Sequence, residues 1–246
     1  MKEEKKMNDI RVLLVIPAYN EAENIERVVD DLIEHYPQYD YLVINDCSTD
    51  NTEEILRNRG YSYISLPVNL GIGGAVQSGY LYGAQNEYDI VVQIDGDGQH
   101  DPAYVENLIQ PILNGEADMV VGSRFIQKQG FQTSFLRRVG IGMIRNVIKI
   151  CCGVKITDTT SGFRATSKAL TQLFAKEYAQ DYPEPEAIVL AELRGYHVTE
   201  IPVKMNEREG GKSSINALRS VYYMIKVSLA LFLLRIGIGK KRRKKR

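Results

Sequence analysis

Short apolar segments rich in β-branched residues recur along the first half of the chain and alternate with longer amphipathic segments. Segments of this length and composition predict buried strands of a mainly parallel sheet. The predicted strands are Arg11–Ile16, Tyr41–Ile44, Tyr63–Leu66, Ile90–Ile94 and Met119–Val121. Because helical patterns separate them, the expected fold class is α/β, a doubly wound layered sheet that binds ligands where its strands end in loops.

Three helices are predicted between these strands. Apolar side chains at helical spacing form one stripe over Ile25–Tyr36, and Asn20 with Glu23 resembles a capping box that opens this helix. Asp101, followed by a proline, opens a second helix. A third follows Gly74, where small residues recur every four positions and permit close packing against the sheet, at Ala75, Gly79 and Gly83.

The second half of the chain has a different pattern after Gly122. It predicts a basic apolar helix at Phe135–Cys152, followed by a polar loop that holds TDTTSGFRATSK. A shorter helix is expected near Glu186–Arg194 and a strand near His197–Val203. A glycine-rich turn at Glu209–Lys212 and a long apolar helix at Ile215–Ile238 come last. We therefore expect one domain over residues 1–214, and a separate helix with a basic tail over residues 215–246.

Composition and charge narrow the class of protein. Apolar residues make up 44% and charged residues 25% of the 246-residue chain, which is typical of a folded protein and argues against disorder or a multispan membrane protein. Lys and Arg (31) balance Asp and Glu (31), but seven basic residues form the tail Lys240–Arg246, so the rest of the chain has a net charge of −7. The three cysteines form no CxxC pair and no signal-like stretch precedes the first strand, so a reducing cytosol is expected.

The segment QIDGDGQHDP, at Gln93–Pro102, carries the clearest chemistry. A predicted strand delivers Asp95 and Asp97 into a glycine-containing loop, and Gln99 follows two residues later. Two carboxylates and an amide oxygen suit a hard divalent cation, which takes oxygen ligands and leaves positions for phosphate. The alternative is a loop that merely turns the chain. His100 is expected to flank the loop, with a place among the metal ligands as the alternative.

Two other strand ends meet the same edge of such a sheet. Residues 17–21 follow the first strand and residues 45–50 follow the second, and an aromatic ring with carboxylates at these positions suits a base and a ribose. Helix capping by the polar residues of both segments is the simpler alternative. Two phosphate-binding fingerprints fail, because Val76 stands where GxGxxG needs its last glycine and Asn206 stands where a Walker A motif begins.

Seven motifs occur in unbroken order from about Arg11 to Ser214: IPAYNEAENI, NDCSTDNT, NLGIGGAVQSGY, QIDGDGQHDP, VGSRF, TDTTSGFRATSK and REGGKSS. As an ordered set they resemble the inverting family 2 glycosyltransferases, in the branch similar to dolichol-phosphate mannose synthase and bacterial polyprenyl-phosphate glycosyltransferases. The resemblance implies a GT-A fold, a nucleotide-sugar donor and a Mg²⁺ or Mn²⁺ cofactor.

The resemblance also assigns roles to individual positions. The nucleotide sugar would be bound by Pro17, Ala18, Tyr19, Glu21, Asp46, Asp95, Arg208, Lys212 and Ser213, and its sugar by Ser161, Gly162 and Arg164. The metal ion would be held by Asp95, Asp97 and Gln99, and the acceptor phosphate would meet Arg124, Arg137 and Arg138. Arg124 and Asp158 would be catalytic.

The implied activity is inverting transfer of a hexose to polyprenyl phosphate, such as undecaprenyl phosphate, for cell-envelope glycan synthesis. The expected donor is UDP-glucose or UDP-N-acetylglucosamine, with GDP-mannose as the alternative. Members that extend saccharides usually carry a Glu-Asp pair as base, whereas this chain has PEPE at Pro183–Glu186. A phosphate monoester, with a second pKa of about 6, is already a dianion and needs no base. Saccharide extension with Glu184 or Glu186 as base, nucleotidyl transfer and a non-catalytic membrane adaptor stay open as alternatives.

A lipid acceptor requires a route to the membrane, and the apolar segment Ser220–Ile238 offers one. Its 19 residues are close to the number that spans a bilayer, but Lys226 and Arg235 interrupt it, which favours an amphipathic helix lying on the membrane. The basic tail adds attraction to anionic lipid, and no nucleic-acid-binding motif accompanies it. We expect a protein on the cytoplasmic face of the cell membrane, helped by a small membrane-protein partner or by homo-oligomerisation.

Overall fold

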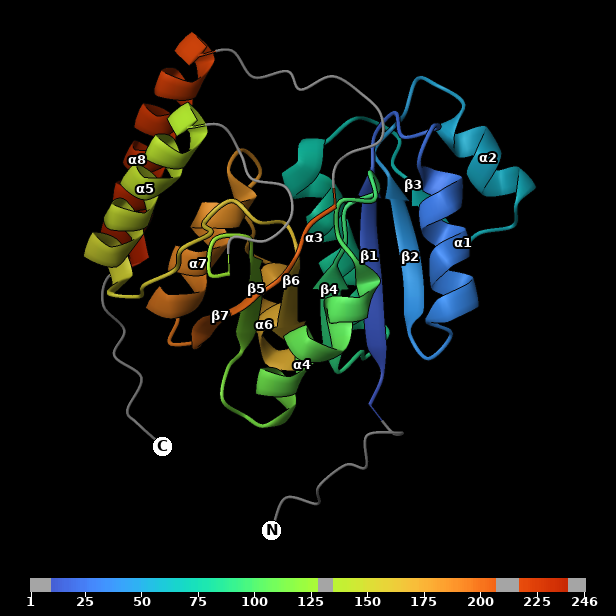
Figure 1. The fold of residues 1–246 in the computed structure, drawn as a ribbon, viewed down its shortest axis with the longest axis horizontal. Helices are drawn as coiled ribbons and strands as arrows, with labels where there is room; N and C mark the ends of the chain where they lie inside the picture. The colour runs from blue at the N-terminus through green and yellow to red at the C-terminus, as the bar shows by residue number, and fades with distance from the viewer. Residues whose placement is uncertain (1–9, 128–134, 207–216, 239–246) are drawn as a thin grey trace.

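Figure 1 shows the computed structural model, which describes residues 10–127, 135–206 and 217–238. In this part of the chain seven strands form one sheet in the order β3-β2-β1-β4-β6-β5-β7. The strands are β1 (Val12–Ala18), β2 (Asp40–Asn45), β3 (Tyr63–Ser65), β4 (Ile90–Gln93), β5 (Met119–Ser123), β6 (Arg164–Ser167) and β7 (Val198–Pro202). Every strand except β6 lies where the sequence predicts one, and the expected α/β class is confirmed.

The sheet is mainly parallel, as predicted. Parallel pairs join β1 to β2 and β4, β2 to β3, and β5 to β7, whereas β6 runs antiparallel between β4 and β5. The prediction of a continuous polar loop over TDTTSGFRATSK is wrong at β6. Its side chains Arg164 and Thr166 are buried and hydrogen-bonded. The Thr166 hydroxyl, for example, donates to the Val91 carbonyl oxygen at 3.1 Å.

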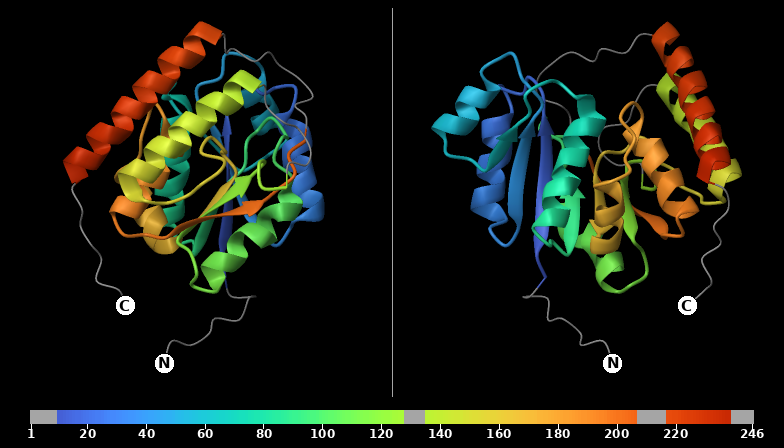
Figure 2. Two further views of the ribbon diagram at one scale, coloured as in Figure 1. Left: turned by 60° about the vertical axis from the view of Figure 1, so that its left-hand side comes forward. Right: turned by 180° about the vertical axis from the view of Figure 1, so that it is seen from behind.

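Helices cover both faces of the sheet (Figure 2). They are α1 (Ile25–His35), α2 (Thr52–Asn58), α3 (Gly71–Gln85), α4 (Val105–Leu113), α5 (Phe135–Cys152), α6 (Lys168–Phe174), α7 (Pro183–Leu193) and α8 (Ala217–Ile238). Successive side chains of β1 point to opposite faces. Leu13 and Val15 join the core under α3, α6 and α7, and Leu14 and Ile16 join the core under α1, α2 and α4.

The predicted stripe of small residues brings α3 close to the sheet. A Cβ atom on Gly79 would lie 2.2 Å from Cγ1 of Val15, and one on Gly83 would lie 2.6 Å from Cγ2 of Val91. Larger side chains at these positions would therefore push the helix away from β1 and β4. The helix begins at Gly71, earlier than the sequence indicated.

The predicted capping box at Asn20 is wrong. α1 begins at Ile25 with Asn24 as its N-cap, and the Asn20 side-chain oxygen instead accepts the backbone N–H of Thr49 at 2.8 Å. Asn20 therefore ties the loop after β1 to the loop after β2. The prediction at Asp101 is confirmed, because its carboxylate accepts the Ala103 N–H at 2.9 Å and opens a 3₁₀ turn that continues into α4.

The helices α5 and α8 lie side by side at one end of the molecule, beyond α7 (Figures 1 and 2). Val227 and Leu231 of α8 are fully buried in the same core as residues of α5 and α7. In the described part of the chain, no helix combines the length and the apolarity needed to cross a membrane. Membrane association of α8 and the domain division near residue 214 both stay predictions.

Candidate active site

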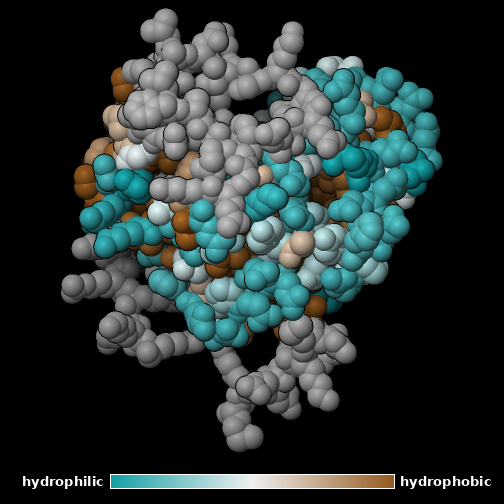
Figure 3. Space-filling view, viewed as in Figure 1, coloured by the Kyte–Doolittle hydropathy of each residue, from teal (hydrophilic) through white to brown (hydrophobic). Residues whose placement is uncertain are grey.

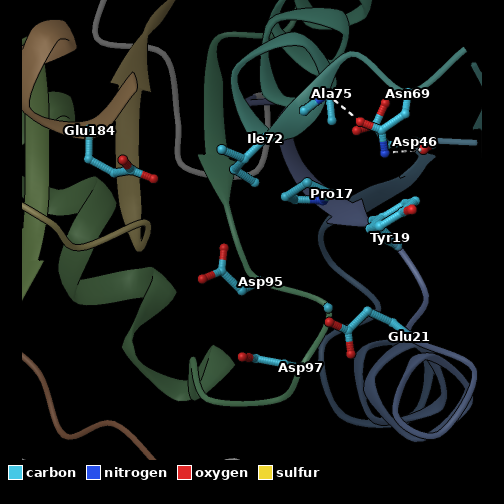
Figure 4. Close-up of a pocket in the computed structure, with 13 residues that line it drawn as sticks. Pro17, Tyr19, Glu21, Asp46, Asn69, Ile72, Ala75, Asp95, Asp97 and Glu184 are labelled. Atoms are coloured by element: carbon cyan, nitrogen blue, oxygen red, sulfur yellow. Dashed lines mark hydrogen bonds between the residues drawn. The ribbon is translucent and has the colours of Figure 1, made fainter. Parts of the chain in front are cut away.

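A pocket of about 360 Å³ lies at the ends of β1, β2 and β4, where the sequence predicted a ligand (Figure 4). It is lined by Pro17, Ala18, Tyr19, Glu21, Asp46, Asn69, Gly71, Ile72, Ala75, Asp95, Gly96, Asp97 and Glu184. Five of these lining residues are acidic and none is basic. An anionic ligand would therefore enter this pocket only with cations that offset the five carboxylates.

Hydrogen bonds between the loops after β1 and β2 shape one end of the pocket. The Asn20 N–H donates to Ser48 Oγ at 3.0 Å, and the Glu21 N–H donates to Thr52 Oγ1 at 2.9 Å. Asn20 adopts a φ of 56°, in the left-handed region. The two loops thus hold each other, while the ring of Tyr19, 48% exposed, stays available to a flat ligand group.

The buried carboxylate of Asp46 fixes the start of α3. Its Oδ1 accepts the Leu70 N–H at 2.7 Å, and its backbone oxygen accepts from the Asn69 amide at 3.1 Å. Asn69, Gly71, Ile72 and Ala75 line the pocket as a result. None of these four was assigned to ligand binding from the sequence, and the signal that could have found them was the motif NLGIGG directly before a predicted helix.

The loop after β4 presents Asp95 and Asp97 to the pocket (Figure 4). Nδ1 of His100 accepts the Asp95 N–H at 3.0 Å, and the His100 ring is buried against Phe163 with 4.8 Å between ring centroids. Asp97 accepts the Gln99 N–H at 3.0 Å. His100 therefore supports the loop from behind, as the flanking role predicts.

Gln99 is not among the residues that line the pocket. Its side-chain amide lies 3.5 Å from the Asn206 carbonyl oxygen, and its own carbonyl oxygen accepts the Asn206 N–H at 2.9 Å. Its predicted role as a metal ligand stays a prediction. Next to Gln99, an isolated antiparallel bridge joins His100 to Met205.

The carboxylates present fit a divalent metal ion that is shared with a ligand. Within the described ranges, no three His, Cys, Asp or Glu residues are grouped closely enough to hold a metal ion on their own. Mg²⁺ and similar ions are commonly bound through one or two carboxylates, with substrate phosphates and water completing the shell. Asp95 and Asp97 supply such a pair at the pocket.

Arg124 and Asp158 form a buried pair, and Arg124 is close enough to Asp95 to feel its charge. The guanidinium donates to Asp158 at 2.6 Å from Nε and 2.7 Å from Nη2, and Nη2 also donates to Thr160 at 3.1 Å. Burial alone lowers the pKa of Arg124, but Asp158 outweighs it, so the net shift is upward and the guanidinium stays charged. Neither residue lines the pocket, and their predicted catalytic roles are untested by this geometry.

The predicted sugar-binding residues lie close behind Asp95. Arg164 is fully buried, and it donates from Nε to the Ser161 carbonyl oxygen and from Nη1 to the Glu184 carbonyl oxygen, both at 3.1 Å. A Cβ on Gly162 would lie 3.0 Å from Oδ1 of Asp95. The structure therefore shows Arg164 holding the first turn of α7, and direct contact of these residues with a sugar stays a prediction.

Glu184 brings α7 to the pocket, on the side away from Tyr19 and Asp46 (Figure 4). The sequence offered it only as one of two alternative bases. The other, Glu186, does not line the pocket, and burial together with the nearby Asp181 raises its pKa above the ordinary value of 4.5.

Five predicted site residues cannot be placed. Arg137 and Arg138 fall in the first turn of α5, and their side chains lie outside the described residues. The predicted phosphate-binding residues Arg208, Lys212 and Ser213 also lie outside the described residues.

The fold and the sequence both match known glycosyltransferases. A solved structure of glucosyl-3-phosphoglycerate synthase from Mycobacterium tuberculosis aligns with a TM-score of 0.67 at 24% identity, over 95% of this chain and 82% of that one, which confirms the GT-A fold. That enzyme has also been solved with Mn²⁺ and uridine diphosphate. The model of glycosyl transferase family 2 matches residues 13–174.

Two curated relatives extend the match to most of the chain. A dolichyl-phosphate beta-glucosyltransferase of Trichomonas vaginalis is 31% identical over 253 residues, covering 93% of this chain and 73% of that protein. An undecaprenyl-phosphate mannosyltransferase of Micrococcus luteus is 30% identical over 217 residues, covering 84% of this chain and 88% of that protein. The chain belongs to glycosyl transferase family 2, as its motifs predicted.

Proposed function

We propose that the protein transfers a hexose from a nucleotide sugar to polyprenyl phosphate, with inversion at the sugar carbon. The observation that carries this proposal is the arrangement of the pocket: Tyr19 and Asp46 at one end, Asp95 and Asp97 between, and Glu184 at the far side. A nucleotide, a diphosphate and a sugar, in that order, match it. The names of the two relatives support the lipid phosphate as acceptor.

Donor binding depends on cations in this proposal, because the charged side chains in the described lining of the pocket are all carboxylates. Asp95 and Asp97 would hold Mg²⁺ or Mn²⁺, which when bound neutralises charge on the departing diphosphate. The Mn²⁺ complex of the mycobacterial synthase supports a divalent ion in this fold. Arg208, Lys212 and Ser213 are proposed to contact the donor phosphates from the adjoining segment.

The acceptor requires orientation and charge neutralisation rather than a base. A phosphate monoester is largely a dianion above its second pKa of about 6, so its oxygen attacks the sugar carbon without losing a proton. Arg124, Arg137 and Arg138 are proposed to face this phosphate. The ion pair with Asp158 restricts Arg124 to one orientation, which suits a group that must be in place before the reaction.

The donor is defined by its sugar and its nucleobase. The two relatives are named for glucose and mannose transfer. We propose UDP-glucose or UDP-N-acetylglucosamine as donor, with GDP-mannose as the alternative, and a role in cell-envelope glycan synthesis at the cytoplasmic face of the membrane.

A second candidate is transfer to a hydroxyl acceptor, as in saccharide extension. The observation that favours it is the position of Glu184, whose carboxylate reaches the pocket and would serve as the base that a hydroxyl needs.

The experiment is to supply labelled nucleotide sugars with undecaprenyl phosphate in detergent or vesicles. We expect an organic-soluble product that mild acid hydrolyses, together with release of a nucleoside diphosphate. A water-soluble labelled glycan would favour the second candidate, and release of pyrophosphate would indicate a nucleotidyltransferase instead.

A further inference from the structure

The helices α5 and α8 form one packed layer at an end of the molecule (Figures 1 and 2). Ile144 and Ile148 of α5 are buried in the same core as Val227 and Leu231 of α8, and the Cys151 thiol lies 3.7 Å from the Leu231 carbonyl oxygen. Both helices begin at the end of the molecule where β1, β2 and β4 end, which is the end that carries the pocket (Figure 1).

The outer side of this layer is apolar. Among the described residues, fifteen large apolar side chains are exposed, and seven of them lie on these two helices. On α8 they follow helical spacing at Ile225, Leu229, Phe232, Leu233 and Ile236, and on α5 they are Met143 and Ile150. In the space-filling view, hydrophobic residues gather along the left edge, over α5 and α8 (Figure 3). Such a concentration marks an interaction surface rather than scattered exposure.

The charge of the two helices is entirely positive. Neither contains Asp or Glu, whereas they carry seven Lys and Arg residues between them. Outside these helices and the basic tail at residues 240–246, the chain has 17 basic and 31 acidic residues. Arg145, Lys149 and Lys226 are exposed beside the apolar side chains. The molecule therefore has one cationic, apolar end and an acidic body.

We propose that the exposed sides of α5 and α8 together bind the surface of an anionic lipid bilayer. Apolar side chains would enter the region between headgroups and acyl chains, while the long basic side chains extend to lipid phosphates. Each Lys or Arg near such a surface adds electrostatic attraction to it, and the acidic body is repelled from it. The proposal rests on the proposed function, because it explains how the pocket reaches an acceptor that stays in the membrane.

A second copy of the chain is the other candidate for this surface. In a two-fold dimer the same patch faces itself. Two faces that carry only positive charge would then meet and repel each other. An anionic bilayer would attract the same face instead. The charge pattern therefore favours lipid over self-association.

The test measures sedimentation of the full chain with vesicles, without any acceptor lipid. We expect binding to vesicles of phosphatidylcholine mixed with phosphatidylglycerol, weaker binding to phosphatidylcholine alone, and weakening by salt. Leu229→Glu on α8 and Ile150→Glu on α5, 58% and 70% exposed, should each reduce the partition coefficient about tenfold or more. Ile33→Glu on α1, 47% exposed, is the matched control and should change nothing.

Three results would overturn the proposal. Equal binding to neutral and anionic vesicles would contradict the role of charge. Loss of binding in Leu229→Glu but not in Ile150→Glu would exclude α5 from the surface. A wild-type dimer that Leu229→Glu converts to a monomer, with vesicle binding unchanged, would make the face an interface between copies. Circular dichroism melts of each variant exclude unfolding as the cause.

A water-soluble short-chain isoprenyl phosphate separates this proposal from the proposed function. Transfer to that acceptor in vesicle-free buffer, without vesicle binding, would overturn the docking surface and leave the function standing. Vesicle binding without transfer to any phosphate acceptor would overturn the proposed function and leave the docking surface standing.

Discussion

Arg124 and Asp158 meet through two side-chain hydrogen bonds in a buried ion pair, and the Arg124 backbone N–H donates to the same carboxylate at 3.1 Å. The pair joins the end of β5 to the loop before β6. Glu200 of β7 holds that loop from the other side, because its carboxylate accepts the Thr157 N–H at 2.9 Å. Two motifs that are 34 residues apart in sequence therefore behave as one structural unit.

Asp158→Asn should destabilise the fold, because it leaves the buried guanidinium of Arg124 without a countercharge. Removing one partner of a buried ion pair costs about 3–5 kcal/mol, and the loss should appear in the free energy of unfolding measured in urea. Glu177→Gln is the control, since Glu177 pairs with Arg194 at the surface and an exposed pair contributes about 1 kcal/mol at most. Equal losses in both variants would contradict the special position of Asp158.

Asp97→Asn should abolish metal-dependent binding of the donor. The described pocket lining has five acidic and no basic residues, so without the ion nothing in this lining offsets the repulsion between the carboxylates and the diphosphate. We expect turnover to fall by about a thousandfold and calorimetric binding of nucleoside diphosphate to lose its response to Mg²⁺ or Mn²⁺. A chelator should have the same effect on the wild type.

Gln99→Ala is the companion variant, since Gln99 does not line the pocket. It should keep metal-dependent binding with a reduction of about tenfold or less. A loss as large as that of Asp97→Asn would show that Gln99 is a metal ligand, as its motif predicts. Unchanged turnover in the chelator-treated wild type would contradict the metal site itself.

Glu184→Gln distinguishes the two candidate acceptors. A phosphate dianion needs no base, so turnover with polyprenyl phosphate should fall by less than about tenfold and keep its pH profile. A hydroxyl acceptor would instead lose about 10²–10⁴-fold in turnover. Rates measured with both acceptors across a pH series provide the comparison, and a loss of that size with polyprenyl phosphate would show that Glu184 acts in the proposed reaction.

Glu186→Gln should raise stability at neutral pH. Burial and Asp181 raise the pKa of Glu186 in the folded protein above 4.5, so above that pH the unfolded chain releases its proton first. Stability is therefore lost as pH rises from 4.5 through the folded-state pKa, and the neutral amide removes this loss. Thermal melts from pH 4 to pH 8 should show a flatter profile for the variant, with turnover unchanged. An identical profile in the two proteins would contradict the prediction.

The main strands were predictable because β1, β4 and the Leu42–Ile44 part of β2 contain apolar runs whose side chains are buried on both faces. β6 was not, because its burial depends on partners distant in sequence, such as Val91 for Thr166. Strand alternation cannot by itself place Gln99 beside Asp95 and Asp97, because β4 ends at Gln93 and Gly98 adopts a φ of 77°. The role of Gln99 as a metal ligand therefore stays a prediction.

Part of the pocket was also predictable. Tyr19, Asp46, Asp95 and Asp97 follow strand ends at one edge of a parallel sheet, and topology alone brings them together. Glu184 arrives from α7, and its position depends on Arg164 bonding to its carbonyl oxygen. No local pattern in the sequence contains that contact.

Gly79→Ala should separate the packing of α3 from the helix propensity of alanine. The added Cβ would stand 2.2 Å from Cγ1 of Val15, so α3 must shift away from β1, and overpacking of this kind costs about 1–3 kcal/mol. Because Ile72 and Ala75 of α3 line the pocket, the shift should also raise the KM for the donor. Unfolding in urea and donor kinetics measure the two effects.

Gly142→Ala provides the control in another helix, because a Cβ there has no atom within 4 Å. Alanine is favoured over glycine in a helix by about 1 kcal/mol, so this variant should be more stable than the wild type and unchanged in KM. Adding Val15→Ala to Gly79→Ala removes the clashing methyl groups and should restore part of the lost stability and the donor KM together. A double variant that loses at least as much unfolding free energy as the two single variants lose in sum would contradict this. In that case the contact between α3 and β1 does not limit the position of the helix, and the close approach at Gly79 does not position the pocket.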